Sequence, residues 1–93
     1  MPSTNSKCYN VFHIFNILYE KRDDFKKYLL KNKITTEIHY PVSLNNQNGL
    51  QHLFSNQKFP ISELIHSTTL SLPISYFHTE DDINYVIEKL NAF

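Results

Sequence analysis

The clearest pattern of apolar and polar positions lies near the carboxyl end of the chain. Apolar side chains recur there at helical spacing: Ile83, Val86, Ile87, Leu90 and Phe93. Thr79 stands in front of them at a cap position, and the acidic residues 80–82 fill the first turn. An oxygen-bearing cap and acidic side chains both stabilise the amino end of a helix. The pattern therefore predicts a helix that begins after Thr79 and buries one apolar stripe.

The first third of the chain predicts a strand followed by a helix. Residues 8–19 are rich in aromatic and β-branched side chains at both parities, which predicts a strand covered on both faces, or on one face by the chain and on the other by a partner. Residues 22–32 carry apolar side chains three and four apart, with acidic residues at the start and lysines at the end, which predicts a helix. Because no glycine follows, Asn32 or Lys33 is expected to adopt the left-handed conformation that ends the helix.

The middle of the chain predicts short elements. Residues 34–39 alternate, which predicts a strand with Ile34, Thr36 and Ile38 on one face and Thr35, Glu37 and His39 on the other. Pro60 suits the first turn of a short helix, and residues 70–73 form a brief extended piece that ends at its proline. This order predicts an α+β fold: a small two- to three-stranded, mostly antiparallel sheet with helices packed mainly on one face.

Composition sets the class of protein and its setting. The chain has 93 residues, nine basic and nine acidic side chains and a single cysteine. We expect a disordered lead over residues 1–7 and one small domain over residues 8–93. The balanced charge argues against a nucleic-acid partner, and no apolar run approaches the roughly 20 residues of a membrane span. With no signal-peptide pattern and only Cys8 as a thiol, a cytoplasmic location is expected.

The segment Ile38-His39-Tyr40-Pro41 is the candidate site. Pro41 ends the predicted strand and holds Tyr40 in extended geometry. His39 and Tyr40 should then point to opposite sides, one toward the domain and the other toward a ligand. The same residues also suit a plain exit from a strand into a loop.

Other catalytic chemistry is not indicated by the spacing of the remaining residues. The histidines at 39, 52, 66 and 78 fall on different predicted elements without the paired spacing of metal ligands. A glycine-rich phosphate loop is excluded because Gly49 is the only glycine. We expect no metal site and no catalytic residue.

Seven ordered segments carry a family resemblance over Val11 to Phe93. They are Phe12-His13-Ile14-Phe15, Arg22-Asp23, Leu29-Leu30 with Ile34, Ile38-His39-Tyr40-Pro41, Phe59-Pro60-Ile61-Ser62-Glu63, Leu70-Ser71-Leu72-Pro73-Ile74, and Thr79 to Ile87. In this order they resemble the carboxy-terminal small domain of the DegT/DnrJ/EryC/StrS nucleotide-sugar aminotransferases. Those enzymes depend on pyridoxal phosphate and have an aspartate aminotransferase-like fold. The chain departs from the family pattern at Lys33, Ser43 and Asn45, where the family usually has glycine, proline and a second histidine.

The resemblance implies an isolated carboxy-terminal domain or fragment of a keto-sugar aminotransferase of polysaccharide or lipopolysaccharide biosynthesis. In the family, the Schiff-base lysine and the phosphate-binding residues belong to a large amino-terminal domain. The resemblance therefore implies no bound cofactor and no transaminase activity for this chain alone. It also implies that His39 and Tyr40 contact the nucleotide-sugar substrate when the enzyme is complete.

A second hypothesis comes from the apolar pattern of residues 8–19. A small sheet leaves one face uncovered, so the chain could be an α+β interaction module that self-associates or binds a partner chain. The expected partners are then a missing large domain or another copy of the chain.

Overall fold

Three extended segments lie side by side at the centre of the molecule. The computed structural model describes residues 6–93. Strand β1 (Phe15–Leu18) pairs antiparallel with β2 (Thr69–Leu72), with Leu18 opposite Thr69. On the other edge of β2, Glu37 forms an isolated antiparallel bridge with Ser71. Strand β2 is therefore the middle segment, and all four of its residues are buried.

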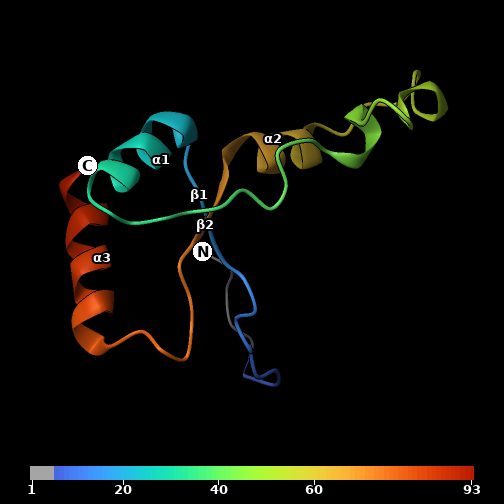
Figure 1. The fold of residues 1–93 in the computed structure, drawn as a ribbon. Coiled ribbons are helices and arrows are strands. Elements are labelled where there is room, and N and C mark those ends of the chain that lie inside the picture. Colours follow the sequence, from blue (N-terminus) through green and yellow to red (C-terminus); the bar gives the residue numbers. More distant parts are fainter. Residues whose placement is uncertain (1–5) are drawn as a thin grey trace.

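Three helices surround this centre (Figure 1). They are α1 (Arg22–Lys31), α2 (Pro60–Thr68) and α3 (Glu80–Ala92), and two short 3₁₀ turns lie between α1 and α2, η1 (Leu44–Asn46) and η2 (Gln51–Leu53). The predicted α+β class with a small antiparallel sheet is confirmed. Helix α1 follows β1, and α2 leads directly into β2.

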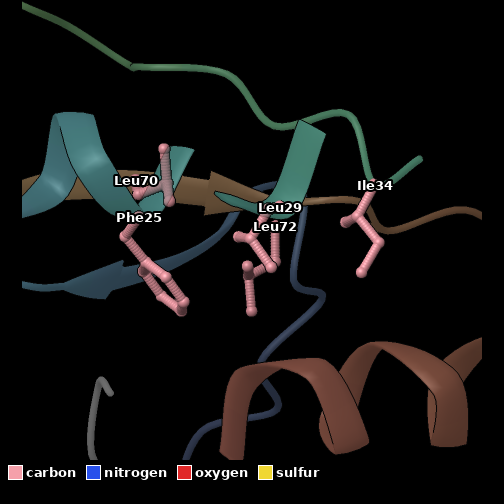
Figure 2. Close-up of a cluster of buried hydrophobic side chains, with 5 residues drawn as sticks. All are labelled: Phe25, Leu29, Ile34, Leu70 and Leu72. Carbon is pink, nitrogen blue, oxygen red and sulfur yellow. The ribbon is translucent and has the colours of Figure 1, made fainter. Parts of the chain in front are cut away.

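The core is a single cluster on one face of the sheet. Its buried members are Phe25, Leu29, Ile34, Leu70 and Leu72. Figure 2 shows that these side chains come from α1, β2 and the segment after α1, and that Phe25 and Ile34 point toward the side where α3 runs. From α3, Val86 and Leu90 pack against the cluster.

Helix α3 docks mainly through aromatic contacts at its end. The ring of Phe93 lies 4.8 Å from the rings of both Phe25 and Tyr28. The hydroxyl of Tyr85 donates to the carbonyl of Asn32 at 3.1 Å. The predicted helix and its Thr79 cap are confirmed, since the Thr79 hydroxyl accepts from the Asp82 amide at 3.2 Å.

The expected burial of the α3 stripe is wrong in extent. Val86 and Leu90 are half-buried, whereas Ile83, Ile87 and Phe93 remain exposed. Val86 and Leu90 pack against the core cluster and the Phe93 ring meets those of Phe25 and Tyr28, so the stripe is covered only in part.

The predicted strand over residues 8–19 is also wrong in length. Only residues 15–18 pair, and their partner strand β2 ends at Leu72, opposite Phe15. Phe12 has a φ of 47°, which interrupts the extended run in front of β1. Leu18 is exposed, so the chain itself does not cover β1 on both faces, and coverage of the other face by a partner stays a prediction.

Residues 34–39 form a third extended segment rather than a full strand. They meet β2 through one bridge at Glu37, and the helix before them ends as predicted, with Lys33 at a φ of 61°. The predicted alternation is confirmed where the segment lies beside β2. Ile34 and Ile38 belong to the core side, whereas Thr35, Glu37 and His39 line a hollow.

The molecule is flat and extended. Its radius of gyration is 15.8 Å, larger than the about 12 Å of a compact domain of this length. Helix α2 and the loop before it reach away from α1 and α3 (Figure 1).

The amino-terminal lead is described only in part. Residues 1–5 of the predicted lead lie outside the described residues, whereas Ser6 and Lys7 form an exposed turn. Disorder of residues 1–7 and a single domain over 8–93 therefore stay predictions. None of the helices within residues 6–93 is long and apolar enough to cross a bilayer.

Candidate functional site

An open hollow of about 190 Å³ lies where the third extended segment meets β2. One wall is polar and the other apolar. The lining residues are His13, Ile14, Thr35, Glu37, His39, Ser71, Leu72, Pro73 and Ile74. A surface with one polar and one apolar wall suits a ligand that carries hydroxyl groups on its edge and C–H groups on its face.

The polar wall is built by strand alternation. Thr35, Glu37 and His39 stand two residues apart on the extended segment, so their side chains share a face. The backbone is fixed at Glu37, whose amide donates to the Ser71 carbonyl at 3.1 Å and whose carbonyl accepts from the Ser71 amide at 2.7 Å. This bridge sets the position of the polar wall relative to β2.

His39 is held by a side chain of β2. Its Nδ1 lies 2.8 Å from Oγ of Ser71, a residue that is only 5% exposed. The bond engages one ring nitrogen and leaves Nε2 for a ligand. The structure thus places His39 at the hollow, where a binding residue is expected.

Tyr40 lies beside His39 and not across the chain from it. The two rings meet edge to face, with centroids 5.4 Å apart and an interplanar angle of 89°. The prediction that the two side chains point to opposite sides is therefore wrong. The alternation that it assumed holds as far as His39 but does not include Tyr40, since the last pairing of this segment with β2 is the bridge at Glu37.

The backbone of Tyr40 is fixed from α2. Nδ1 of His66 lies 2.6 Å from the Tyr40 carbonyl, which can only accept, so His66 donates this bond. The carbonyl of His66 in turn accepts from Nη1 of Arg22 on α1 at 2.7 Å. Tyr40 as a whole residue is 63% exposed and can meet a ligand.

These groups can bind but do not form a catalytic constellation. Imidazole, carboxylate and hydroxyl groups supply hydrogen bonds, and the hollow holds no cysteine or lysine. Cys8 is exposed and lies outside the hollow. Among the described residues, no group of three or more histidine, cysteine, aspartate or glutamate side chains could hold a metal ion.

The described residues also do not fit pyridoxal phosphate. The amino ends of α1 and α3 carry acidic residues, which repel a phosphate group. A Schiff-base lysine needs a lowered pKa, whereas the hydrogen bond to Glu88 raises the pKa of Lys89. The ammonium of Lys26 is bound to the Thr36 carbonyl at 2.9 Å.

A second hollow, of about 410 Å³, lies at the start of α1 and is lined mostly by charged side chains of both signs. The Arg22 side chain within it already bonds Asp23 and the His66 carbonyl. Because its lining carries both positive and negative charges, this hollow does not favour one class of ligand.

Sequence reasoning missed the residues that support the site. Ser71 and His66 come from β2 and α2, far along the chain from the His39–Tyr40 pair. Glu37 and Thr35 could have been found, because they share the parity of His39 in the alternating segment. Substrate binding by His39 and Tyr40 stays a prediction.

Comparison with known proteins decides the family. Residues 1–91 match the DegT/DnrJ/EryC1/StrS aminotransferase family. The chain belongs to this family. Its polar hollow and its His39–Tyr40 pair are thus features of a member of this aminotransferase family.

Two curated relatives show the extent of the match. The chain is 33% identical over 93 residues to the dTDP-3-amino-3,6-dideoxy-alpha-D-galactopyranose transaminase of Aneurinibacillus thermoaerophilus, covering 100% of this chain and 25% of the relative. It is 33% identical over 86 residues to the pleiotropic regulatory protein of Geobacillus stearothermophilus, covering 91% of this chain and 23% of the relative. The chain thus spans about a quarter of the length of these relatives.

Solved structures agree with the fold. A DegT DnrJ EryC1 StrS aminotransferase from Brucella abortus superposes with a TM-score of 0.76 at 28% identity, over 86% of this chain and 22% of that structure. The sugar aminotransferase CalS13 from Micromonospora echinospora has a TM-score of 0.74 at 18% identity, over 85% of this chain and 21% of that structure. The second likeness bears on the fold alone.

Proposed function

We propose that this chain is the substrate-binding small domain of a pyridoxal-phosphate-dependent nucleotide-sugar aminotransferase. The single observation that carries the proposal is coverage: the whole chain aligns with a quarter of a transaminase whose name states a dTDP-linked amino sugar. The Schiff-base lysine and the phosphate contacts would come from polypeptide outside the matched quarter. On this proposal the chain alone transfers no amino group.

The size and walls of the hollow support the proposal. Its volume of about 190 Å³ is below the roughly 300–1,000 Å³ of complete small-molecule sites. A hollow of this size fits one wall of a larger site. Its polar side, with Glu37 and His39, suits sugar hydroxyl groups, and the exposed apolar Ile14 and Ile74 suit the C–H face of the ring.

In this role His39 and Tyr40 contact the substrate sugar, and the pathway is the cytoplasmic synthesis of sugars for polysaccharide or lipopolysaccharide. Nε2 of His39 supplies a hydrogen bond to a hydroxyl group, and the exposed Tyr40 phenol supplies a second. Both act by binding and orienting the sugar and not by forming a bond to it.

A segment exchange tests the proposal. The matched quarter of the Aneurinibacillus transaminase is replaced by residues 1–93, and amino-group transfer from its dTDP-3-amino sugar is measured. We expect an active chimera whose KM rises roughly tenfold in His39→Ala, the effect of one lost hydrogen bond to substrate. His52→Ala, an exposed histidine on η2, is the matched control. A chimera that binds cofactor but transfers nothing would overturn the proposal.

A second candidate, a self-associating interaction module, is favoured by the exposed apolar side chains of α2. Ile61 and Leu64 are 73% and 60% exposed, and Ile65 lies beside them at helical spacing. Leaving such side chains in water forgoes roughly 1.5–3 kcal/mol each relative to burial. The zero formal net charge supplies no repulsion against association.

Sedimentation of the chain over a wide concentration range tests this candidate. We expect a concentration-dependent dimer that Leu64→Glu disrupts. Leu30→Glu, at an exposed leucine of α1, is the control and should leave the dimer intact. A monomer at every concentration would exclude the module.

A further inference from the structure

Two hydrogen bonds hold the His39–Tyr40 pair from two different elements. Ser71 of β2 bonds the His39 ring at 2.8 Å, and His66 of α2 bonds the Tyr40 carbonyl at 2.6 Å. The two rings of the pair touch edge to face, so the placement of one limits the placement of the other. Neither supporting residue follows from the local sequence around the pair.

The position of Ser71 is fixed more firmly than that of His39, the residue whose ring its hydroxyl group contacts. It lies in the middle segment of the sheet, opposite Asn16 of β1 on one edge and bridged to Glu37 on the other. A serine side chain has one rotatable carbon–carbon bond, so Oγ varies little once the backbone is fixed. The exposed His39 is therefore oriented by a buried hydroxyl group, and its Nδ1 is engaged.

The His66 contact also defines the tautomer of the neutral ring. Because the Tyr40 carbonyl can only accept, Nδ1 of His66 must carry the hydrogen when the ring is neutral. Arg22 holds the carbonyl of the same residue at 2.7 Å, and its side chain is only 13% exposed. The Tyr40 backbone is thus connected through α2 to α1.

We propose that Ser71 and His66 are positioning residues, which orient the His39 imidazole and the Tyr40 phenol toward a sugar hydroxyl group. The ligand class rests on the proposed function, whereas the two orienting bonds belong to the chain itself. Ser71 sets the ring nitrogen that faces the hollow, and His66 sets the backbone from which the phenol projects.

Nitrogen-15 NMR of the imidazoles in the 93-residue chain tests the two bonds directly. At alkaline pH, where imidazole is neutral, we expect His66 in the Nδ1–H tautomer. We expect the Nδ1 shift of His39 to differ from that of His52, which is exposed and serves as the internal reference. A His39 spectrum identical to that of His52, or a His66 ring protonated on Nε2, would overturn the inference without any variant.

Variants then assign the shifts. Ser71→Ala should bring the His39 shift to the His52 value, and Ser71→Thr, which keeps a hydroxyl group, should restore it. Ser67→Ala, at an exposed serine of α2, is the control and should change nothing. If Ser71→Ala folds and leaves the His39 shift unchanged, Ser71 does not position the ring.

The active chimera supplies the functional readout. Ser71→Ala should raise KM for the dTDP-amino sugar several-fold with kcat less affected, because it loosens a binding residue and leaves the reacting groups in place. His66→Asn, whose amide can replace the Nδ1–H donor, should retain more activity than His66→Ala. An inactive chimera would defeat the proposed function, while the NMR result would still decide whether the two bonds exist.

Discussion

Strand β2 and helix α3 show that an element's burial does not follow from how clearly its own sequence specifies it. The four residues of β2 are all buried, although nothing in their sequence marks a strong strand. The thirteen residues of α3 have the best-defined start of any element, yet none of them is fully buried. An element can therefore be strongly specified by its own sequence and still contribute little to the core.

The difference arises because the start of α3 is stabilised by residues close in the sequence, whereas β2 is buried by residues far from it in the sequence. At the start of α3 the Thr79 amide donates to Asp82 Oδ2 at 2.9 Å, and the Asp82 amide donates back to Thr79. These partners are three residues apart. The neighbours of β2 are β1, the segment at Glu37 and helix α1, all of which lie far along the chain. Burial thus depends on the folded chain and not on the local pattern.

The largest expected effect is that of Leu70→Ala in β2. Leu70 is 0% exposed and sits in the core cluster, so truncation should lower the free energy of unfolding by about 2–5 kcal/mol. Denaturant melts measure this loss. Leu64→Ala, at an exposed leucine of α2, is the matched control and should change stability by less than about 0.5 kcal/mol.

Leu90→Ala in α3 should have a smaller effect. Leu90 is half-buried at the edge of the core, so the expected loss is about 1–2 kcal/mol. A loss equal to that of Leu70→Ala in the same melts would show that α3 belongs to the core as fully as β2 does.

Thr79→Ala removes the side chain of the cap and should cost about 1 kcal/mol. Thr79→Ser keeps the hydroxyl group that accepts from the Asp82 amide and should retain most of the stability. If the two variants unfold at the same denaturant concentration, the hydroxyl group does not stabilise α3.

The smallest expected effect is a pH dependence from Asp82. Hydrogen bonds from the backbone and side chain of Thr79 lower the pKa of Asp82 below its ordinary value of 3.8. The stabilisation is therefore complete above 3.8 and is lost as the pH falls through the lower folded value. Helix content measured by circular dichroism during acid titration should show this loss. Asp82→Asn, which cannot ionise, should reduce the acid-dependent change.

The sequence predicted those features that depend on neighbouring residues. The extents of α1 and α3, the Thr79 cap and the left-handed Lys33 all follow from side chains within a few positions. The alternation of residues 34–39 also held, and it correctly placed His39 on the polar face.

Features that depend on pairing between residues far apart in the sequence could not be predicted from the local pattern. The run over residues 8–19 has strand composition throughout, but its partner β2 ends at Leu72, so only residues 15–18 pair. The shared side of His39 and Tyr40, and their support by Ser71 and His66, depend on how β2 and α2 return to the segment.

The pairing of β1 with β2 has a consequence for how fast the chain folds. Leu18 pairs with Thr69, so residues 19–68 must form a closed loop before the sheet exists. Closing a long loop costs entropy before its contacts form, whereas helices such as α1 can form from local contacts. The hollow combines residues 13–14 and 35–39 with residues 71–74. It therefore arises only after this slow closure, so that ligand binding would report the completion of folding.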